Sequence, residues 1–349
     1  MDMSQPTLEA LRADAAPSVT LRAPGRLHLG FLDPAASLGR RFGSLGLVIE
    51  GFETEVALSA ASANQVTATG VAEQAEVERA RAHLQRLQQH SGQHEPLHLT
   101  LLRVLPAHAG FGSGTQLALA IGRAFAQWHG LELTTPALAQ WLGRGARSGI
   151  GIAGFDLGGL LVDGGPGGPR REGAHATPAP LLARQPLPEA WRVLVVQDDA
   201  RRGLSGADER EAIATLAPLP QSLAADICHQ VLMRVLPGAA CAEFAPFAAG
   251  ITHIQQLLGA HFAPAQGGSA YTSAAVGCLL DWIGAAGHGA AIGQSSWGPT
   301  GFAILPSQAQ AEAVVEAARA ANVVAAGLTL HIVAGRNSGA TVIDSRRAR

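Results

Sequence analysis

Pro106-Ala-His-Ala-Gly-Phe-Gly-Ser-Gly-Thr-Gln116 is the stretch from which the fold of this 349-residue chain can be worked out. It follows a mainly apolar run at 98–105 that predicts a strand, and it leads into 117–126, which predicts a helix. A glycine-rich turn between a strand and a helix presents free backbone N–H groups to an anion such as a phosphate or diphosphate. The candidate ligand-binding residues of this loop are Gly110, Gly112, Ser113, Gly114 and Thr115.

The same loop has a second interpretation. Glycine is abundant, with 42 residues, so the loop can be a tight turn in which Ser113 or Thr115 caps the helix. The spacing excludes two nucleotide-binding patterns. No Gly-Lys-Ser/Thr follows, as a Walker A loop requires, and the glycine spacing differs from the dinucleotide fingerprint. A phosphate cradle and a tight turn both remain open.

The composition indicates a globular chain with a large core. Apolar residues make up 47% and charged residues 15%, and the length suits one large or two medium domains. A net charge of −2 and few aromatic residues argue against nucleic acid or a membrane as partner. The sequence predicts neither a membrane-spanning stretch nor a secretory signal, so we expect a cytoplasmic protein.

The order of predicted elements indicates an α+β fold in two domains. We expect a mobile leader over 1–17, an N-terminal domain over 18–187, a C-terminal α+β domain over 188–340 and a basic tail over 341–349 that is frayed at 346–349. The predicted strands are 19–29, 45–49, 53–59, 98–105, 155–162, 191–197, 289–292, 301–305 and 328–333. The predicted helices are 73–89, 117–126, 135–142 with Thr135 as its N-cap, 213–249 with breaks at 218–220 and near 237–238, 269–285 and 309–321. The predicted linker is 174–189.

A second polar segment, Gly293-Gln-Ser-Ser-Trp-Gly-Pro-Thr-Gly301, joins two predicted strands late in the chain. Polar clusters beside glycines often line binding sites, whereas a plain core turn rarely needs so many hydrogen-bonding side chains. The alternative is a turn whose tryptophan packs against the core. The candidate site residues of this segment are Gln294, Ser295, Ser296 and Trp297.

Arginine and histidine mark two more candidates. Arg26 and His28 lie on the same side of a predicted strand, because side chains alternate along a strand; the alternative is an ordinary polar strand face. Arg147 and Ser148 lie in a segment with two arginines and several glycines. That segment either holds an anionic group or forms a solvated helix end and a flexible loop.

Three segments together resemble the motifs of the GHMP kinase superfamily: Ala23-Pro-Gly-Arg26, the loop 106–116 and a glycine-rich strand-turn motif late in the chain. The chain resembles more closely the β-ribofuranosylaminobenzene 5′-phosphate synthases, a family of methanopterin biosynthesis. That resemblance covers about 19–330. It is carried by Arg147-Ser-Gly-Ile-Gly151, Gly158-Gly with Val162-Asp-Gly-Gly165, and Gly293-Gln-Ser-Ser-Trp-Gly-Pro-Thr300.

The resemblance implies a GHMP-kinase-like two-domain fold. Its N-terminal domain is of the ribosomal protein S5 domain 2 type, its C-terminal domain is ferredoxin-like, and the site lies in their cleft. Where the kinases carry Ser-Gly-Ile-Asp, this chain has Gly151 in place of the catalytic Asp. A kinase needs a positioned base, so no ATP is expected.

The resemblance implies instead a pentosyltransferase. It would join 5-phosphoribosyl 1-diphosphate to 4-hydroxybenzoate or 4-aminobenzoate, giving a C-riboside 5′-phosphate, CO₂ and diphosphate. An ATP-dependent small-molecule kinase and a non-catalytic ligand sensor on the same fold remain alternatives.

The resemblance also implies residue roles and partners. The glycine loop would stabilise the leaving diphosphate with Arg26 or Arg147, and the segment 294–297 would line the ribose or arene side. His28 would contact the 5′-phosphate or act on the phenol or amine. Mg²⁺ and a homodimer are expected as well. The carboxylates of Asp208 and Glu209 are candidates to hold Mg²⁺ between the protein and the diphosphate. They fit equally well as acidic residues in the first turn of a helix.

Overall fold

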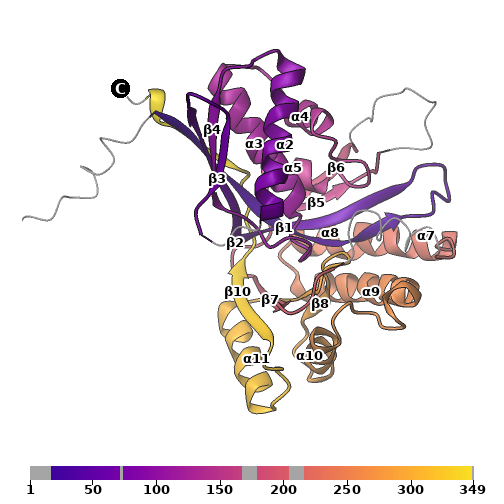
Figure 1. Cartoon of the computed structure of the whole chain (residues 1–349). Helices are drawn as coiled ribbons and strands as arrows, with labels where there is room; N and C mark the ends of the chain where they lie inside the picture. Colours follow the sequence, from indigo (N-terminus) through magenta and orange to yellow (C-terminus); the bar gives the residue numbers. More distant parts are fainter. Residues whose placement is uncertain (1–16, 71–73, 167–178, 204–215, 348–349) are drawn as a thin grey trace, which may run out of the picture.

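The computed structural model of the chain describes residues 17–70, 74–166, 179–203 and 216–347. These residues form two sheets, each covered by helices (Figure 1). The predicted leader lies outside the described residues except for Pro17. Among the described helices, none has both the length and the apolar character needed to cross a bilayer.

The first sheet has seven described strands. Its order is β11-β1-β2-β4-β3, with β5 paired to β2 and β6 paired to β5, and only β3 and β4 run parallel. Helix α3 packs on β1 and β2, and α2 and α4 pack on α3. The strands are β1 Ser18–Asp33, β2 Phe42–Ala60, β3 Gln65–Ala68, β4 Leu97–Arg103, β5 Leu160–Asp163, β6 Leu181–Gln185 and β11 Thr341–Asp344, and the helices are α2 Gln74–Ser91, α3 Ser113–His129, α4 Thr135–Trp141 and α5 Ile150–Leu157.

The second sheet is antiparallel, with the order β10-β7-β9-β8. Helices lie between β7 and β8 and again between β9 and β10, which is the βαββαβ arrangement of a ferredoxin-like domain. The predicted two-domain α+β fold is therefore confirmed. The strands are β7 Arg192–Asp198, β8 Ala291–Gln294, β9 Thr300–Leu305 and β10 Leu328–Ala334, and the helices are α7 Gln221–Gln230, α8 Leu236–Ala240, α9 Phe244–Phe262, α10 Ala274–Ala285 and α11 Gln308–Ala320.

One hydrophobic core joins the two sheets. Leu27 of β1 and Leu47 of β2 belong to the same buried cluster as Val193 of β7, Phe247 of α9 and Phe302 of β9. All five side chains are fully buried. The loops at this junction, including the glycine loop before α3, are therefore supported from both halves of the molecule.

Two predictions for the middle of the chain are wrong. The strand predicted at 155–162 begins as helix α5, and only Leu160–Asp163 is a strand. A short apolar run does not distinguish helix from strand, and here Gly158 and Gly159, with φ of 65° and 88°, turn the chain between the two. The predicted linker at 174–189 contains β6, which pairs with β5; residues 167–178 lie outside the described residues.

Residues 341–347 do not form the predicted basic tail, because they pack against the first sheet and its helices. β11 pairs antiparallel with residues 19–22 of β1. The Arg346 guanidinium lies 4.5 Å from the centre of the Trp128 ring and donates hydrogen bonds to the carbonyls of Gln127 and Trp128. Charge pairing, backbone pairing and a cation–π contact together order this segment.

Two boundaries also differ from the predictions. The strands predicted at 45–49 and 53–59 form one continuous strand, β2. The N-cap of α4 is Thr134, whose hydroxyl accepts from the N–H of Ala137. The hydroxyl of the predicted cap, Thr135, instead donates to the Asp156 carboxylate at 2.6 Å.

Candidate active site

The glycine loop ends in a helix start that no side chain caps. Gly112, with φ 73°, is the N-cap residue of α3, and the N–H groups of Thr115 and Gln116 bond to its carbonyl at 3.0 and 3.1 Å. The N–H groups of Ser113 and Gly114 come before these first intrahelical bonds, so helix geometry leaves them available. The interpretation in which Ser113 or Thr115 caps α3 is wrong.

The Arg26 side chain lies over this helix start. A methyl group added at Gly112 would touch its guanidinium, and one added at Gly151 would lie 3.0 Å from its Nε. The Arg26 N–H also donates to the carbonyl of Phe111 at 3.1 Å. Gly151 stands where the resembled kinases carry their catalytic Asp, and the space beside it is here occupied by a guanidinium.

His28 is neutral at physiological pH. Burial, reinforced by the charges of Arg26 and Arg147, lowers the pKa of His28 to about 3. Its side chain is 5% exposed, and Nε2 has no hydrogen-bond partner among the described residues. Burial also lowers the pKa of Arg26, to about 10, against the opposing charge of Asp163. At pH 7 the pair is therefore one cation and one neutral imidazole.

A buried carboxylate shapes the loop that carries Arg147. Asp163 accepts hydrogen bonds from the N–H of Gly149 at 2.8 Å, the N–H of Gly165 at 2.7 Å and the hydroxyl of Ser148 at 3.2 Å. Burial raises the pKa of Asp163, and these hydrogen bonds oppose that rise. The Ser148 hydroxyl thus holds the loop in place while Arg147 lines the cavity described below.

The turn between β8 and β9 ties the glycine loop to β1. The Ser295 hydroxyl donates to the carbonyl of Gly110 at 2.7 Å and accepts from the N–H of His28 at 2.9 Å. The N–H of Ser296 donates to the His28 carbonyl at 3.1 Å. Gly298 packs against the backbone of Gly110. Ser295 is fully buried, so it positions the site residues.

The Gln294 side chain also forms hydrogen bonds that hold neighbouring segments in place. Its Nε2 donates to the carbonyl of Ser296 at 2.8 Å and to Gln266 Oε1 at 2.9 Å, and its Oε1 accepts from the N–H of Thr272 at 2.6 Å. Trp297 is 3% exposed and packs on Phe262, with ring centres 5.0 Å apart. Trp297 therefore packs against the core, as the turn interpretation predicts, and it also lines the cavity described below.

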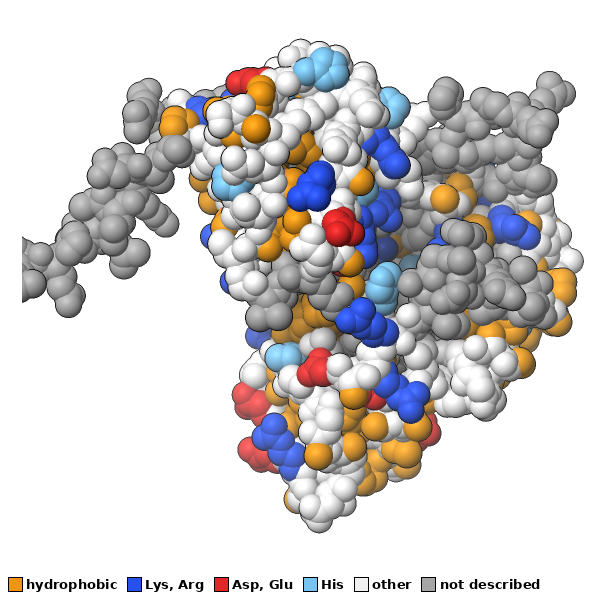
Figure 2. All heavy atoms as spheres, viewed as in Figure 1, with side chains coloured by type: hydrophobic (Ala, Val, Ile, Leu, Met, Phe, Trp, Pro, Cys, Tyr) orange, Lys and Arg blue, Asp and Glu red, His pale blue; other side chains and the backbone are white. Residues whose placement is uncertain are grey.

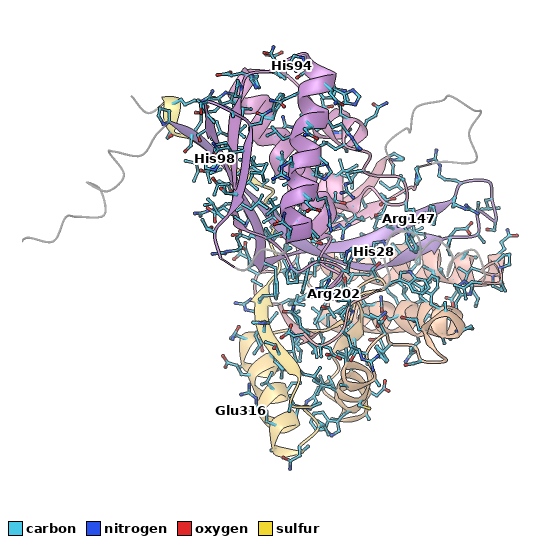
Figure 3. The ribbon with its side chains drawn as sticks, viewed as in Figure 1. His28, His94, His98, Arg147, Arg202 and Glu316 are labelled. Carbon is cyan, nitrogen blue, oxygen red and sulfur yellow. The ribbon has the colours of Figure 1, made fainter. Side chains whose placement is uncertain are left out.

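These segments surround a cavity of about 980 Å³ at the junction of the two halves. Around this hollow, arginine and histidine side chains gather on the face shown in Figure 2, and Figure 3 shows His28 and Arg147 at the same junction. The described lining includes no Asp or Glu. Its charged and imidazole residues are Arg26, Arg41, Arg79, Arg144, Arg147, His28, His108 and His261.

The cavity lining also includes most of the predicted site residues, namely Gly110, Gly112, Ser113, Gly114, Thr115, Ser148, Ser296 and Trp297. A smaller pocket of about 40 Å³ adjoins it, and the two share His28, Ser296 and aromatic side chains. Gln294 lines this smaller pocket, whereas Ser295 lines neither. The aromatic residues shared by both are Phe31, Phe262 and Trp297.

Three lining arginines were not predicted individually. Arg79 lies on α2, where a charged residue on an amphipathic helix gives no signal that separates a site from a solvated face. Arg144 belongs to the segment with two arginines that the sequence did single out. Arg41 lies just before β2, in a stretch with no recognisable motif.

The described residues do not fit a protein-bound Mg²⁺ ion. No group of three His, Cys, Asp or Glu side chains among them could hold a metal. The lining offers guanidinium groups where Mg²⁺ prefers oxygen ligands. Asp208 and Glu209, the acidic residues considered from the sequence, lie outside the described residues.

Comparison with known proteins agrees with this architecture. The GHMP kinases N terminal domain matches residues 77–159, and the GHMP kinases C terminal domain matches 244–324. Phosphomevalonate kinase of Streptococcus pneumoniae has the same fold, with a TM-score of 0.66 at 12% identity over 90% of this chain and 99% of that one. Homoserine kinase of Cytophaga hutchinsonii gives a TM-score of 0.64 at 15% identity, covering 98% of this chain and 100% of that one.

A closer relative identifies the family. The β-ribofuranosylphenol 5′-phosphate synthase of Archaeoglobus fulgidus is 34% identical over 297 residues, which cover 83% of this chain and 88% of that protein. The chain therefore belongs to the β-ribofuranosylphenol 5′-phosphate synthases, a family of enzymes within the GHMP kinase superfamily.

Proposed function

We propose that this protein joins 5-phosphoribosyl 1-diphosphate to 4-hydroxybenzoate or 4-aminobenzoate, forming a C-riboside 5′-phosphate, CO₂ and diphosphate in the biosynthesis of a tetrahydromethanopterin-type cofactor. The name of the Archaeoglobus fulgidus relative refers to a phenol product, which favours the hydroxy acid. The expected homodimer remains part of the proposal.

One observation carries the proposal: the described cavity lining is rich in arginine, free of carboxylates, and built on an uncapped helix start. Such a lining suits a polyanionic substrate whose negative charge grows at the leaving group. In the proposed complex, Arg26 and Arg147 contact the diphosphate, and the N–H groups of Ser113 and Gly114 donate to its oxygens.

The proposed chemistry conserves atoms and electrons. The bond between ribose C1 and the diphosphate oxygen breaks, its electron pair leaves with diphosphate, and C1 becomes oxocarbenium-like. The ring carbon bearing the carboxylate is para to the hydroxyl or amine, so it is electron-rich and bonds to C1. The carbon–carboxylate bond then breaks, CO₂ leaves, and its electron pair restores the aromatic ring.

His28 suits this chemistry because its imidazole is uncharged. A cationic side chain would oppose a developing oxocarbenium ion, whereas a neutral one offers an acceptor nitrogen. We assign to His28 the role of accepting the proton of the hydroxyl or amine as that group donates electrons to the ring. That proton becomes strongly acidic in the intermediate, so even a weak base accepts it. His28 returns this proton to the same oxygen or nitrogen when loss of CO₂ restores the aromatic ring.

The Mg²⁺ ion expected from the resemblance is proposed as a companion of the substrate diphosphate, whose oxygens are suitable ligands. No observation favours the two alternatives, a kinase or a ligand sensor. For a kinase, the described lining lacks a carboxylate base.

The test uses the full-length protein with 5-phosphoribosyl 1-diphosphate and carboxyl-labelled 4-hydroxybenzoate or 4-aminobenzoate, with and without Mg²⁺. We expect labelled CO₂ and diphosphate in equal amounts from at least one acid. Arg26→Gln should lower kcat/KM by roughly 100-fold or more, as loss of a transition-state donor does. Arg319→Gln, on the exposed side of α11, is the matched control and should retain full activity.

Absence of labelled CO₂ from both acids with Mg²⁺ present would overturn the proposal. ATP-dependent phosphorylation of a small molecule by the same preparation would point to the kinase alternative instead. An unchanged rate in Arg26→Gln would remove that residue from the site.

A further inference from the structure

The same cavity contains a second cluster of positive charge, on the α2 side. Arg79 of α2 and Arg144 of the loop after α4 both line it. Arg86 approaches from α2, since its NH1 would lie 3.5 Å from a methyl at Gly143. The carboxylate of Glu76 is paired with Arg79 at 3.2 Å. The half-buried Arg79 and Arg144, with the exposed Arg86 beside them, thus outnumber the one carboxylate.

The cluster is partly withdrawn from water. Burial, together with the charges of Arg79 and Arg86, lowers the pKa of Arg144, against the opposing charge of Glu76. Arg144 Nε is buried and has no hydrogen-bond partner among the described residues. His83 lies 3.4 Å from Arg144 NH2, and burial with the three neighbouring arginine charges lowers its pKa to about 3. The histidine is therefore neutral. Of the two half-buried arginines, Arg79 is paired with Glu76, and Arg144 has no partner carboxylate among the described residues.

Arg79 and Arg144 are half-buried, whereas Arg86 is exposed. Positive charge that is partly withdrawn from water and exceeds the nearby negative charge is unfavourable unless an anion pairs with it. The cluster borders a cavity large enough for a ligand, and arginine is well suited to phosphate because its fork donates two parallel hydrogen bonds. A phosphate monoester matches both the charge and the donor geometry.

The position of the cluster relates it to the site already described. A methyl at Gly114 would lie 3.4 Å from Arg144 NH1, whereas one at Gly112 would touch the Arg26 guanidinium. These two glycines are separated by about 3 Å of helix rise. Two arginines from different parts of the chain therefore flank one helical turn, close enough for a single ligand with two anionic groups to contact both.

We propose that Arg79 and Arg144 form a second anion subsite that binds a phosphate monoester, while Arg26 and Arg147 bind the diphosphate. This assignment rests on the proposed function, whose substrate carries a 5′-phosphate and a 1-diphosphate on one ribose. The aromatic pocket beside His28 adjoins the Arg26 end of the cavity. Because the arene bonds to C1, the diphosphate belongs at that end and the 5′-phosphate at the α2 end.

The test measures binding of ribose 5-phosphate and of inorganic diphosphate to the full-length protein by calorimetry. Arg144→Gln and Arg79→Gln should weaken ribose 5-phosphate binding by roughly 10-fold or more, the effect of losing a hydrogen bond to a charged group. Both should leave diphosphate affinity nearly unchanged. Arg26→Gln should show the reverse preference, and Arg319→Gln should alter neither ligand.

Equal loss of both ligands in Arg144→Gln and Arg26→Gln would overturn the assignment of two subsites. So would unchanged affinity for ribose 5-phosphate in Arg144→Gln and Arg79→Gln. Thermal melting of each variant separates loss of binding from loss of folding. If one of Arg144→Gln and Arg79→Gln does not fold, the other still tests the subsite. Neither ligand undergoes decarboxylation, so this result stands or falls separately from the CO₂ assay.

Discussion

At the scale of single residues, the site depends on places where a side chain is missing. Arg26 reaches the start of α3 because Gly112 and Gly151 have no Cβ to exclude it. The sequence shows both glycines, and Gly112 was assigned to a phosphate cradle. The space beside these glycines is filled by the Arg26 guanidinium from β1, and no local sequence pattern predicts that contact.

Gly112→Ala should therefore impair binding more than folding. Gly112 and Gly130 are the two caps of α3, and both have left-handed φ, 73° and 64°. Alanine at either position should cost about 1–2 kcal/mol of stability. Only at Gly112 would the new methyl touch Arg26, since nothing lies within 4 Å at Gly130. We expect Gly112→Ala alone to lower kcat/KM, by roughly 100-fold.

Urea unfolding gives the stability of both alanine variants, and steady-state kinetics gives their activity. An equal activity loss in Gly130→Ala would show that backbone strain, rather than contact with Arg26, causes the effect.

His83 should make the fold sensitive to acid. Its pKa in the folded protein is about 3, below the ordinary 6.5, so the unfolded chain takes up a proton that the folded chain does not. The folded state loses stability as pH falls from 6.5 towards 3, and this one histidine should account for about 2 kcal/mol between pH 7 and pH 5. At pH 7 and above, this effect is absent.

The check compares urea unfolding of the wild type and His83→Gln at pH 7 and pH 5. The variant should lose about 2 kcal/mol less than the wild type on acidification. His94→Gln, at an exposed position, should lose as much as the wild type. Parallel pH profiles for wild type and His83→Gln would contradict a buried neutral histidine.

At the scale of elements, the β8–β9 turn acts as a clamp between the glycine loop and β1. Ser295 bonds to both segments, whereas the Thr300 hydroxyl, at the other end of the same turn, is buried without a hydrogen-bond partner among the described residues. The sequence placed Ser295 among the ligand-binding candidates, because a polar residue in a loop has the same signature whether it binds a ligand or another loop.

Ser295→Ala should destabilise the protein by about 2 kcal/mol or more, because the Gly110 carbonyl and the His28 N–H would lose their partner in a buried place. Thr300→Val should be neutral or stabilising, since it removes a hydroxyl that makes no hydrogen bond. Chemical denaturation distinguishes the two. Similar destabilisation by both substitutions would mean that the loss of packing, not of hydrogen bonds, is responsible.

Elements were predictable where local periodicity was strong. Helix α2, with its apolar stripe, and the short apolar strands of the ferredoxin-like half were expected from sequence. Strand β6 was not, because its residues are half-exposed and follow many prolines, and only pairing with β5 makes them a strand. Helix α5 was misread because a short apolar run fits both periods.

At the scale of the whole molecule, the chain leaves the second sheet after β10 and returns to the first. The Arg336 N–H donates to the Val48 carbonyl at 2.9 Å, and its side chain pairs with Glu53. β11 then covers the edge of β1. The C-terminal segment therefore belongs to the N-terminal half in space, although it is the most distant part of the chain in sequence.

A chain ending at Ala340 should be less stable and more prone to aggregate. It loses β11 and the contacts of Arg346, each hydrogen bond contributing about 1 kcal/mol, and it exposes the edge of β1. We expect the melting temperature to fall by several degrees, as measured by calorimetry. A chain ending at Arg347 keeps these contacts and is the control. Equal melting temperatures for the two chains would contradict a structural role of β11.

The sequence alone was sufficient for the superfamily, through the resemblance of its motifs to known ones. It was also sufficient for the α+β elements and the glycine loop, because glycine spacing and apolar periodicity are properties of neighbouring residues. Only the tertiary structure decided that Arg26 faces Gly112 and Gly151, that Ser295 bonds to Gly110 and His28 from 185 and 267 residues away, and that Arg79 joins Arg144. Burial, electrostatic fields and hydrogen bonds act through space, so the cavity between the two halves comes into existence only when the chain has folded.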